Sequence, residues 1–127
     1  MRKTERFPVK GANSLWHVYD TVPFWKVIKN FIFIQAARYS PFLSWKNFFY
    51  RTFLRMEVGK ETSFALMVMV DVMFPERIKV GNNTIIGYNT TILAHEYLID
   101  EYRIGDVIIG DRVLIGANST ILPGVTI

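Results

Sequence analysis

The stretches VGNNTIIGYNTTILAHEY (residues 80–97) and IGDRVLIGANSTILPGVT (residues 109–126) repeat with a period of six residues. Each hexapeptide begins with Val or Ile, and glycine follows that aliphatic residue in four of the six. The fifth place is small or β-branched in all but one of them, being Thr84, Thr90, Val113, Ser119 and Val125. Short β-branched runs separated by Gly and Asn indicate strands that alternate with tight turns.

This pattern predicts a coil of stacked strands in which the aliphatic first residue and the small fifth residue point inward. Gly and Asn between them tolerate the positive φ that tight corners require. Stacked coils bury a continuous ladder of side chains, so each coil is stabilised mainly by its neighbours. The predicted fold is therefore mainly β, a parallel β-helix built from hexapeptide repeats.

The repeat is interrupted between Ile92 and Ile109, which lie seventeen residues apart. The inserted EYLIDEYRIGD is charged and aromatic where the flanking hexapeptides are aliphatic, so we expect it to project as a loop. His95 stands at its root, beside Glu96, which replaces the small fifth residue. Imidazole has an ordinary pKa near neutrality and suits acid–base work. His95 is therefore a candidate general base, with a structural surface histidine as the alternative.

The residues before the repeat differ in charge and period. Up to Glu57 the chain has ten Lys and Arg against three Asp and Glu, and from Val58 onward it has five against eight. Residues 21–40 predict an amphipathic helix with a wide apolar face. Ser40 and Pro41 predict the N-cap and first turn of a second helix, along which Asn47, Arg51 and Arg55 recur every four residues. We expect a basic helical segment over residues 1–57 and a β-helical domain over residues 58–127.

These basic, aromatic-rich helices allow two interpretations. Their apolar faces pack on each other and on the rest of the protein, or they make a peripheral contact with a membrane surface. No nucleic-acid recognition motif accompanies the basic side chains, so a nucleic-acid partner is not expected. The longest apolar stretch, FIFIQAA, is far too short to span a bilayer.

The 127 residues contain no cysteine, which excludes disulfides, thiolate metal sites and cysteine nucleophiles from them. The N-terminal residues are basic, but no apolar stretch with a small-residue cleavage site follows them, so a secretory signal is not expected. Both observations fit a cytoplasmic location.

The hexapeptides resemble those of the left-handed β-helix acyltransferases, the hexapeptide-repeat transferase superfamily. Within it, ILAHEYL (92–98), an irregular stretch and then VIIGDRVLIGANSTILPGVTI (107–127) are similar to the branch of maltose and galactoside O-acetyltransferases, and look closest to a bacterial group of acetyltransferases. The resemblance covers residues 58–127. It implies a left-handed coil, acetyl-CoA as the donor, a sugar-like hydroxyl as the acceptor, and a homotrimer with active sites between neighbouring β-helices.

The resemblance also implies roles for single residues. His95 matches the general base that takes a proton from the acceptor hydroxyl as it attacks the thioester. The imidazolium that forms calls for a carboxylate beside it; we predict Glu96, with Asp100 and Glu101 as local alternatives. His17 is expected to be structural.

The remaining predicted site residues concern the two substrates. Asp71 is loosely similar to an acceptor-binding aspartate of the sugar acetyltransferases, with a charge at a coil corner as the alternative. Asn89 and Tyr97 are further candidates for acceptor contact, although Asn89 also suits an inter-coil asparagine ladder. Gly116 and Ala117 match the place where the family's coil contacts the cofactor or the thioester oxygen, and a backbone N–H there would stabilise the developing oxyanion.

Family members usually continue with more coils, so the β-helix is expected to be truncated at Ile127 and its cofactor site incomplete. Zinc enzymes on this scaffold, the γ-class carbonic anhydrases, use three histidines, whereas this sequence has only His17 and His95, so no metal site is expected. A non-catalytic β-helical assembly or membrane-associated scaffold is the alternative function, which an uninterrupted repeat without His95 would favour.

Overall fold

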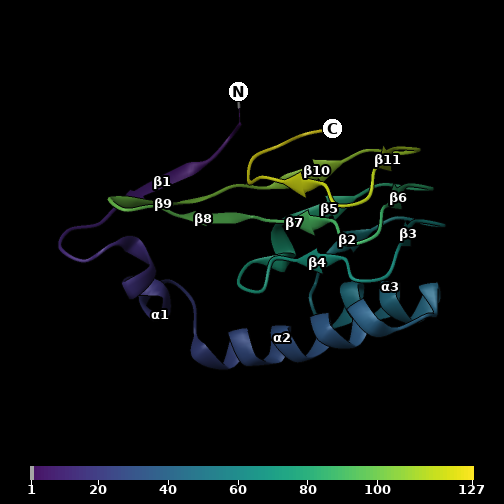
Figure 1. Cartoon of the computed structure of the whole chain (residues 1–127), viewed down its shortest axis with the longest axis horizontal. Helices are drawn as coiled ribbons and strands as arrows, with labels where there is room; N and C mark the ends of the chain where they lie inside the picture. The colour runs from purple at the N-terminus through teal and green to yellow at the C-terminus, as the bar shows by residue number, and fades with distance from the viewer. Residues whose placement is uncertain (1) are drawn as a thin grey trace.

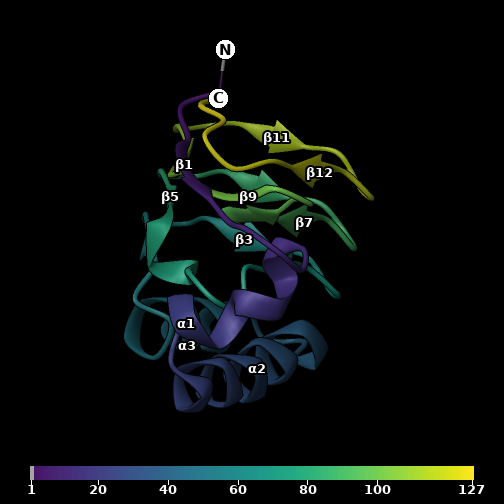
Figure 2. The ribbon, with the colours of Figure 1, turned by 90° about the vertical axis from the view of Figure 1, so that its left-hand side faces the viewer.

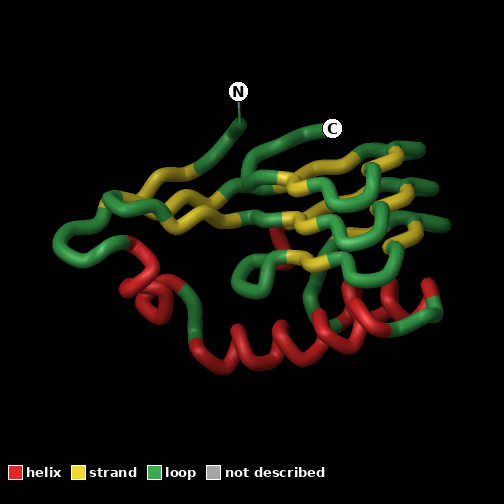
Figure 3. Tube along the Cα trace, in the orientation of Figure 1, coloured by secondary structure: helices red, strands yellow, loops and turns green. Residues whose placement is uncertain are grey.

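A parallel β-helix lies on two helices in the computed structural model, which describes residues 2–127 (Figure 1). Nine short strands form three parallel sheets, and each sheet takes one strand from each of three coils. The sheets are β2 (Glu57–Val58), β5 (Ile78–Val80) and β10 (Val107–Ile109); β3 (Ser63–Phe64), β6 (Ile85–Ile86) and β11 (Leu114–Ile115); and β4 (Met69–Val70), β7 (Thr91–Ile92) and β12 (Thr120–Ile121). Figure 3 shows how turns separate these strands, and the prediction of a parallel β-helix is confirmed.

The inward ladder has the composition that the hexapeptides predict. In the three sheets the stacked residues that lie in register are Val58, Val80 and Ile109; Phe64, Ile86 and Ile115; and Val70, Ile92 and Ile121. All nine are buried, as are Thr84 and Thr90 at the small fifth place. Burying apolar side chains of this size contributes roughly 1.5–3 kcal/mol each, so the ladder makes a large contribution to stability.

The corners of the coil explain the Gly and Asn of the repeat. The fourth residue of a hexapeptide adopts a positive φ, with values of 50° at Asn83, 56° at Asn89 and 60° at Asn118. Gly87 follows the buried Ile86, and a Cβ added there would lie 2.6 Å from the backbone N of Ala117 in the next coil. A side chain at that place would push the coils apart.

The first coil has the same backbone geometry as the later coils, although its residues do not match the hexapeptide pattern. Glu61 and Met67 adopt φ values of 62° and 65°, so VGKETS and FALMVM turn their corners as the later hexapeptides do. The coil then passes through the short 3₁₀ helix η2 (Pro75–Arg77) before β5.

Both predicted helices are present, and the start and the end of the second one are corrected. After η1 (Ser14–His17) and α1 (Val18–Thr21) come α2 (Phe24–Tyr39) and α3 (Leu43–Thr52). Ser40 is not the N-cap of α3, as we expected; it ends α2, and Phe42 precedes α3. Pro41 disfavours the helical conformation at the residue before it, and Ser40 is extended with ψ of 131°. The second helix also ends at Thr52, before Arg55.

The polar side of α3 docks on the first coil. Asn47 Nδ2 donates to the carbonyl of Thr62 at 2.7 Å, and Lys46 Nζ donates to that of Phe64 at 2.9 Å. Arg51 donates to the carbonyls of Val58 and Gly59. These side chains therefore provide hydrogen bonds to the edge of the β-helix.

The hydrophobic core joins the helices to the coils. Ile34 and Ala37 of α2 and Tyr50 of α3 belong to the same buried cluster as Phe64 and Val70. The core therefore continues across the predicted boundary between residues 57 and 58. Figure 2 shows the helices below and the coils stacked above them.

The insertion and the N-terminus form a structure that the sequence did not predict. The insertion projects from the coil, but as an antiparallel hairpin of β8 (His95–Tyr97) and β9 (Glu101–Ile104) in place of the expected loop. The N-terminal segment is also not helical throughout, because β1 (Glu5–Pro8) pairs antiparallel with β9. Phe7 stacks on Tyr102 with ring centroids 4.8 Å apart, and Arg6 bonds to Glu101 at 2.9 Å. Strand β1 thus covers the free edge of the hairpin.

The helices leave much apolar surface uncovered. Large hydrophobic side chains stay exposed on α2 at Phe24, Trp25, Ile28, Phe31 and Ile32. Within the described part of the chain, no helix is both long and apolar enough to cross a bilayer.

Asn47→Ala tests the docking of α3 on the first coil. The substitution leaves the buried carbonyl of Thr62 without its donor, which should lower the free energy of unfolding by about 1–3 kcal/mol. Urea denaturation followed by circular dichroism measures this change. Ser44→Ala, on the exposed side of α3, is the matched control and should change stability by less than about 0.5 kcal/mol. Equal stability of both variants would contradict the proposed role of α3.

Candidate active site

Asp71 and His95 meet at one corner of the β-helix. Asp71 directly follows β4 in the first coil, and His95 begins β8 shortly after β7 in the second coil. Since β4 and β7 are paired neighbours, the chain leaves both strands at the same corner. The Oδ2 atom of Asp71 lies 2.5 Å from Nδ1 of His95. Two residues 24 positions apart thus form a carboxylate–imidazole pair.

The Asp71 carboxylate is buried, and both of its oxygens accept hydrogen bonds. Its Oδ1 accepts the backbone N–H groups of Met73 and Phe74 at 2.8 and 2.9 Å, and its Oδ2 accepts that of Ala94 at 2.6 Å in addition to His95. The side chain is 0% exposed. Burial opposes ionisation, but the bond to His95, its charge and the backbone N–H groups together hold the pKa of Asp71 below its ordinary value. Asp71 is therefore a carboxylate at neutral pH.

This contact decides which nitrogen of His95 is free to react. An ionised carboxylate only accepts hydrogen bonds, so Nδ1 must carry a hydrogen and Nε2 of the neutral ring keeps its lone pair. The His95 side chain is 16% exposed. The arrangement can therefore take a proton at Nε2, while Asp71 stabilises the imidazolium that results.

Two aromatic rings hold the imidazole from the side. Phe74 and Tyr97 make edge contacts with His95, with ring centroids 6.2 and 5.1 Å away. The hydroxyl of Tyr97 lies 2.8 Å from Oγ1 of Thr21, which ties the site to α1. Burial raises the pKa of Tyr97, so its hydroxyl stays protonated at neutral pH and remains a possible donor.

The carboxylates that we predicted from the sequence lie elsewhere. Glu96 pairs with Arg2 and makes no hydrogen bond to His95. Hydrogen bonds from Arg6 and Arg103 lower the pKa of Glu101 to about 2. The contact with the imidazole that we expected of Glu96 is made by Asp71. Asp71 in turn accepts four hydrogen bonds, which leaves its carboxylate no free lone pair for an acceptor.

The other predicted site residues lie at a different corner of the coil. Asn89, Gly116 and Ala117 belong to the turns between the β6 and β7 strands and between β11 and β12. Asn89 Nδ2 donates to Oδ1 of Asn118 at 3.0 Å, the inter-coil ladder that we considered for it. A single chain therefore does not bring these three residues to His95.

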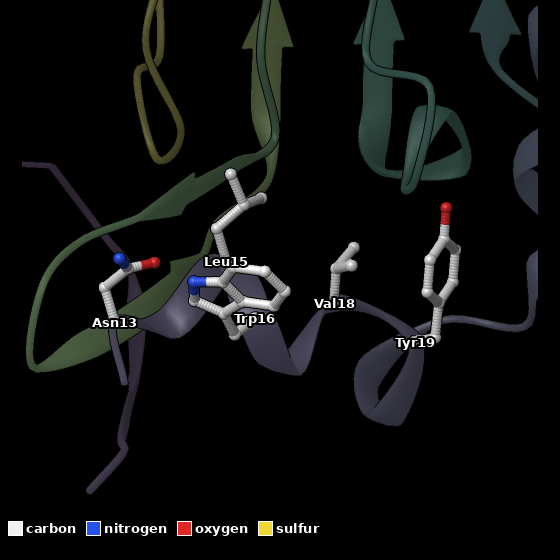
Figure 4. A pocket seen from close by; sticks show the side chains of 5 residues that line it. All are labelled: Asn13, Leu15, Trp16, Val18 and Tyr19. Carbon is white, nitrogen blue, oxygen red and sulfur yellow. The ribbon is translucent and has the colours of Figure 1, made fainter. Parts of the chain in front are cut away.

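A large pocket lies on η1 and α1, as Figure 4 shows. It measures about 510 Å³ and is lined by Asn13, Leu15, Trp16, Val18 and Tyr19. None of these is a predicted site residue, and the lining holds no charged group. The pocket is an apolar hollow without the groups that acid–base catalysis requires.

The second histidine contacts a different carboxylate from the one that His95 contacts. His17 lies 3.6 Å from Oδ2 of Asp20 at the junction of η1 and α1. Among residues 2–127, no group of three or more His, Cys, Asp or Glu side chains is arranged to hold a metal ion.

Comparisons with known proteins agree with the hexapeptide-repeat fold. Residues 106–127 match the family described as "Hexapeptide repeat of succinyl-transferase". The whole chain is 78% identical to "Putative acetyltransferase YvoF" of Bacillus subtilis (strain 168) and covers 74% of that protein. The chain belongs to the hexapeptide-repeat acetyltransferase superfamily. The hexapeptide repeat implies the left-handed sense of the coil.

More distant relatives match part of the chain. "Putative acetyltransferase SAR0816" of Staphylococcus aureus (strain MRSA252) is 48% identical over 77% of this chain and 61% of its own length. "Putative acetyltransferase SAS0727" of strain MSSA476 is 50% identical over 68% of this chain and 54% of its own. The matches thus span less than two thirds of these staphylococcal proteins. No solved structure matches the chain significantly.

Acid unfolding tests the ionised state of Asp71. A lowered pKa means that the carboxylate stabilises the folded state above the ordinary aspartate pKa of about 4, and that this contribution is lost as the pH falls below that value. The free energy of unfolding of the native chain should exceed that of Asp71→Asn by a steady margin at pH 6 and 5, and this margin should shrink between pH 4 and 3. Urea denaturation at each pH measures it, with exposed Asp100→Asn as the control. A margin that stays constant down to pH 3 would contradict the assignment.

Proposed function

We propose that this chain is an O-acetyltransferase that moves an acetyl group from acetyl-CoA to a hydroxyl of a saccharide-like acceptor. His95 is the general base and Asp71 is the positioning residue. The observation that carries the proposal is the bond between the Asp71 carboxylate and Nδ1 of His95 at a coil corner of a hexapeptide-repeat protein. The relatives' names, which describe acetyltransferases, support the same reaction class.

The reaction follows from the protonation state of the pair. Nε2 of His95 accepts the proton of the acceptor hydroxyl as its oxygen attacks the thioester carbonyl, and the new C–O bond forms. Asp71 stabilises the imidazolium during this step. When the C–S bond breaks, His95 returns the proton to the departing thiolate, which leaves an acetyl ester, free CoA and a neutral imidazole. A positioned general base of this kind contributes roughly 10² to 10⁴ in rate.

In this proposal the backbone N–H groups that stabilise the oxyanion come from a second copy of the chain. One chain places Gly116 and Ala117 at a different corner from His95. A homotrimer, the assembly that the family resemblance implies, would bring the Gly116–Ala117 turn of one protomer to the His95 corner of its partner. Acetyl-CoA would then bind between two β-helices.

The experiment that tests the proposal measures release of free thiol from acetyl-CoA with a panel of saccharides. His95→Ala should lower the rate of acetyl transfer by about 10²- to 10⁴-fold. The control, exposed Lys60→Gln, should keep the rate of the native chain. Transfer that does not depend on His95, or no turnover with any acceptor, would overturn the proposal of an acetyltransferase. Such a result would favour a β-helical scaffold.

Asp71→Asn tests whether Asp71 or Glu96 is the carboxylate that positions His95. The amide places an N–H group against Nδ1, so the imidazole must carry its hydrogen on Nε2 and can no longer accept a proton there. We expect a loss of acetyl transfer of at least about tenfold, at unchanged affinity for acetyl-CoA. The matched variant Glu96→Gln compares the alternative directly, because a larger loss in Glu96→Gln than in Asp71→Asn would assign the positioning role to Glu96.

A further inference from the structure

A second cluster of polar side chains lies where α2, the end of α3 and η2 meet. It lines a pocket of about 420 Å³. The polar and aromatic side chains that line it are Trp25, Lys26, Lys29, Asn30, Arg55 and Glu76. None of them takes part in the acid–base chemistry of His95.

The charge of this pocket favours an anion. Three cations and one carboxylate line it, and Lys26 Nζ is paired with Oε1 of Glu76 at 2.6 Å. No ion pair formed among residues 2–127 involves Lys29 or Arg55. Two positive charges therefore share one concavity without a counter-ion. Such an arrangement repels cations and attracts a group such as phosphate.

The neutral groups of the pocket favour a ligand with hydroxyls. Asn30 is 1% exposed, and its Nδ2 donates to the carbonyl of Val72 at 2.8 Å. Its Oδ1 atom is buried without a hydrogen-bond partner, which is a costly condition, and a small rotation of the side chain toward the pocket would let a ligand hydroxyl donate to it. The indole of Trp25 is 66% exposed and provides a flat apolar face next to these polar groups. A phosphate attached to a saccharide matches the charge, the free acceptor and the flat face together.

The pocket is also connected to His95 through one aromatic ring. Lys26 Nζ lies 5.0 Å from the centroid of the Phe74 ring, and the same ring contacts His95 at 6.2 Å. The bond from Asn30 to Val72 reaches the segment that carries Asp71 on one side and Phe74 on the other. An extended ligand lying over Phe74 would span both groups.

We propose that this pocket binds the phosphate ester of the acetyl acceptor, which is a phosphorylated saccharide. This statement rests on the proposed function for the identity of the ligand as the acceptor, but the binding of a phosphate ester does not depend on catalysis. The phosphate can belong to a soluble sugar phosphate or to a lipid headgroup that carries a saccharide. The exposed Trp25 and Ile28 on α2 make both sources accessible to the pocket.

Fluorescence of Trp25 gives a direct binding test. In a Trp16→Phe, Trp45→Phe background, Trp25 is the remaining tryptophan of the chain. We expect its emission to change saturably with glucose 1-phosphate and not with glucose. Adding Lys29→Gln and Arg55→Asn should weaken this binding at least tenfold. Asn tolerates the φ of 58° at Arg55 better than Arg does, so the second substitution should not destabilise the fold.

The control removes the same charge elsewhere. Lys10→Gln with Lys60→Gln takes two exposed positive charges from outside the pocket and should leave the affinity for glucose 1-phosphate unchanged. Vesicles of phosphatidylglycerol, compared with phosphatidylcholine, distinguish the lipid source. A response to phosphatidylglycerol vesicles alone that Lys29→Gln and Arg55→Asn abolish would assign the phosphate to a lipid. No saturable response to either probe, or an equal loss in the control variant, would overturn the proposal.

Kinetics separate this proposal from the proposed function. The variant with Lys29→Gln and Arg55→Asn should raise the KM of a phosphorylated acceptor at least tenfold while kcat stays within twofold, whereas His95→Ala should lower kcat and still bind glucose 1-phosphate. His95-dependent transfer with the same KM for phosphorylated and plain sugars would overturn the phosphate pocket and leave the acetyltransferase standing. Binding without any transfer would overturn only the ligand's identity as the acceptor.

Discussion

The carbonyl edge of the first coil is the constraint on which the rest of the structure depends. Each coil donates backbone N–H groups to the next, as from Gly59 to Val80 and from Gly81 to Ile109. The carbonyls on the opposite side of the first coil therefore need donors from outside the β-helix, because an unpaired buried carbonyl is costly and an open edge invites pairing with other chains. Side chains of α3 supply these donors, and α2 is held against α3 by the stacked rings of Phe33 and Phe53, 3.9 Å apart.

The candidate site depends on the same arrangement, because its two halves come from different coils. Asp71 belongs to the first coil, which α3 holds, and His95 to the second. The N–H of Ala94 binds Asp71 beside the imidazole, so the carboxylate joins the two coils as well as positioning the ring. His95 also begins a hairpin whose outer strand is covered by β1. The imidazole is thereby fixed by a buried carboxylate on one side and a three-stranded sheet on the other.

The sequence predicted the later coils well because their repeats carry the Gly and Asn that the corners require, and it marked His95 because the repeat stops there. The first coil was harder to recognise in detail, since Phe64 stands where later repeats have Ile, and Met67 stands where they have the turn-forming Asn. Val70 pairs with Ile92, so Asp71 lies one coil before the root of the hairpin, a relation that appears only when the coils are aligned. Glu96 was predicted as the partner of His95 from its place in the chain. Adjacent residues of a strand point to opposite faces, so the nearest carboxylate in sequence is directed away from the ring. The pairing of β1 with β9 depends on two segments far apart in sequence and has no local signal.

The segment from Asp71 to Arg77 connects the two groups of polar side chains in this protein. Its first residue binds His95, and Phe74 touches both His95 and Lys26. Glu76 pairs with Lys26 of α2, while Asn30 of the same helix binds the carbonyl of Val72. A helix that served only to cover the coil could do so with apolar contacts, as Ile34 and Ala37 do. Two polar residues in the N-terminal half of α2, Lys26 and Asn30, instead bond to this segment, which begins at the corner that holds the imidazole. The position of α2 therefore controls both the edge of the β-helix and the backbone that supplies the carboxylate of the site.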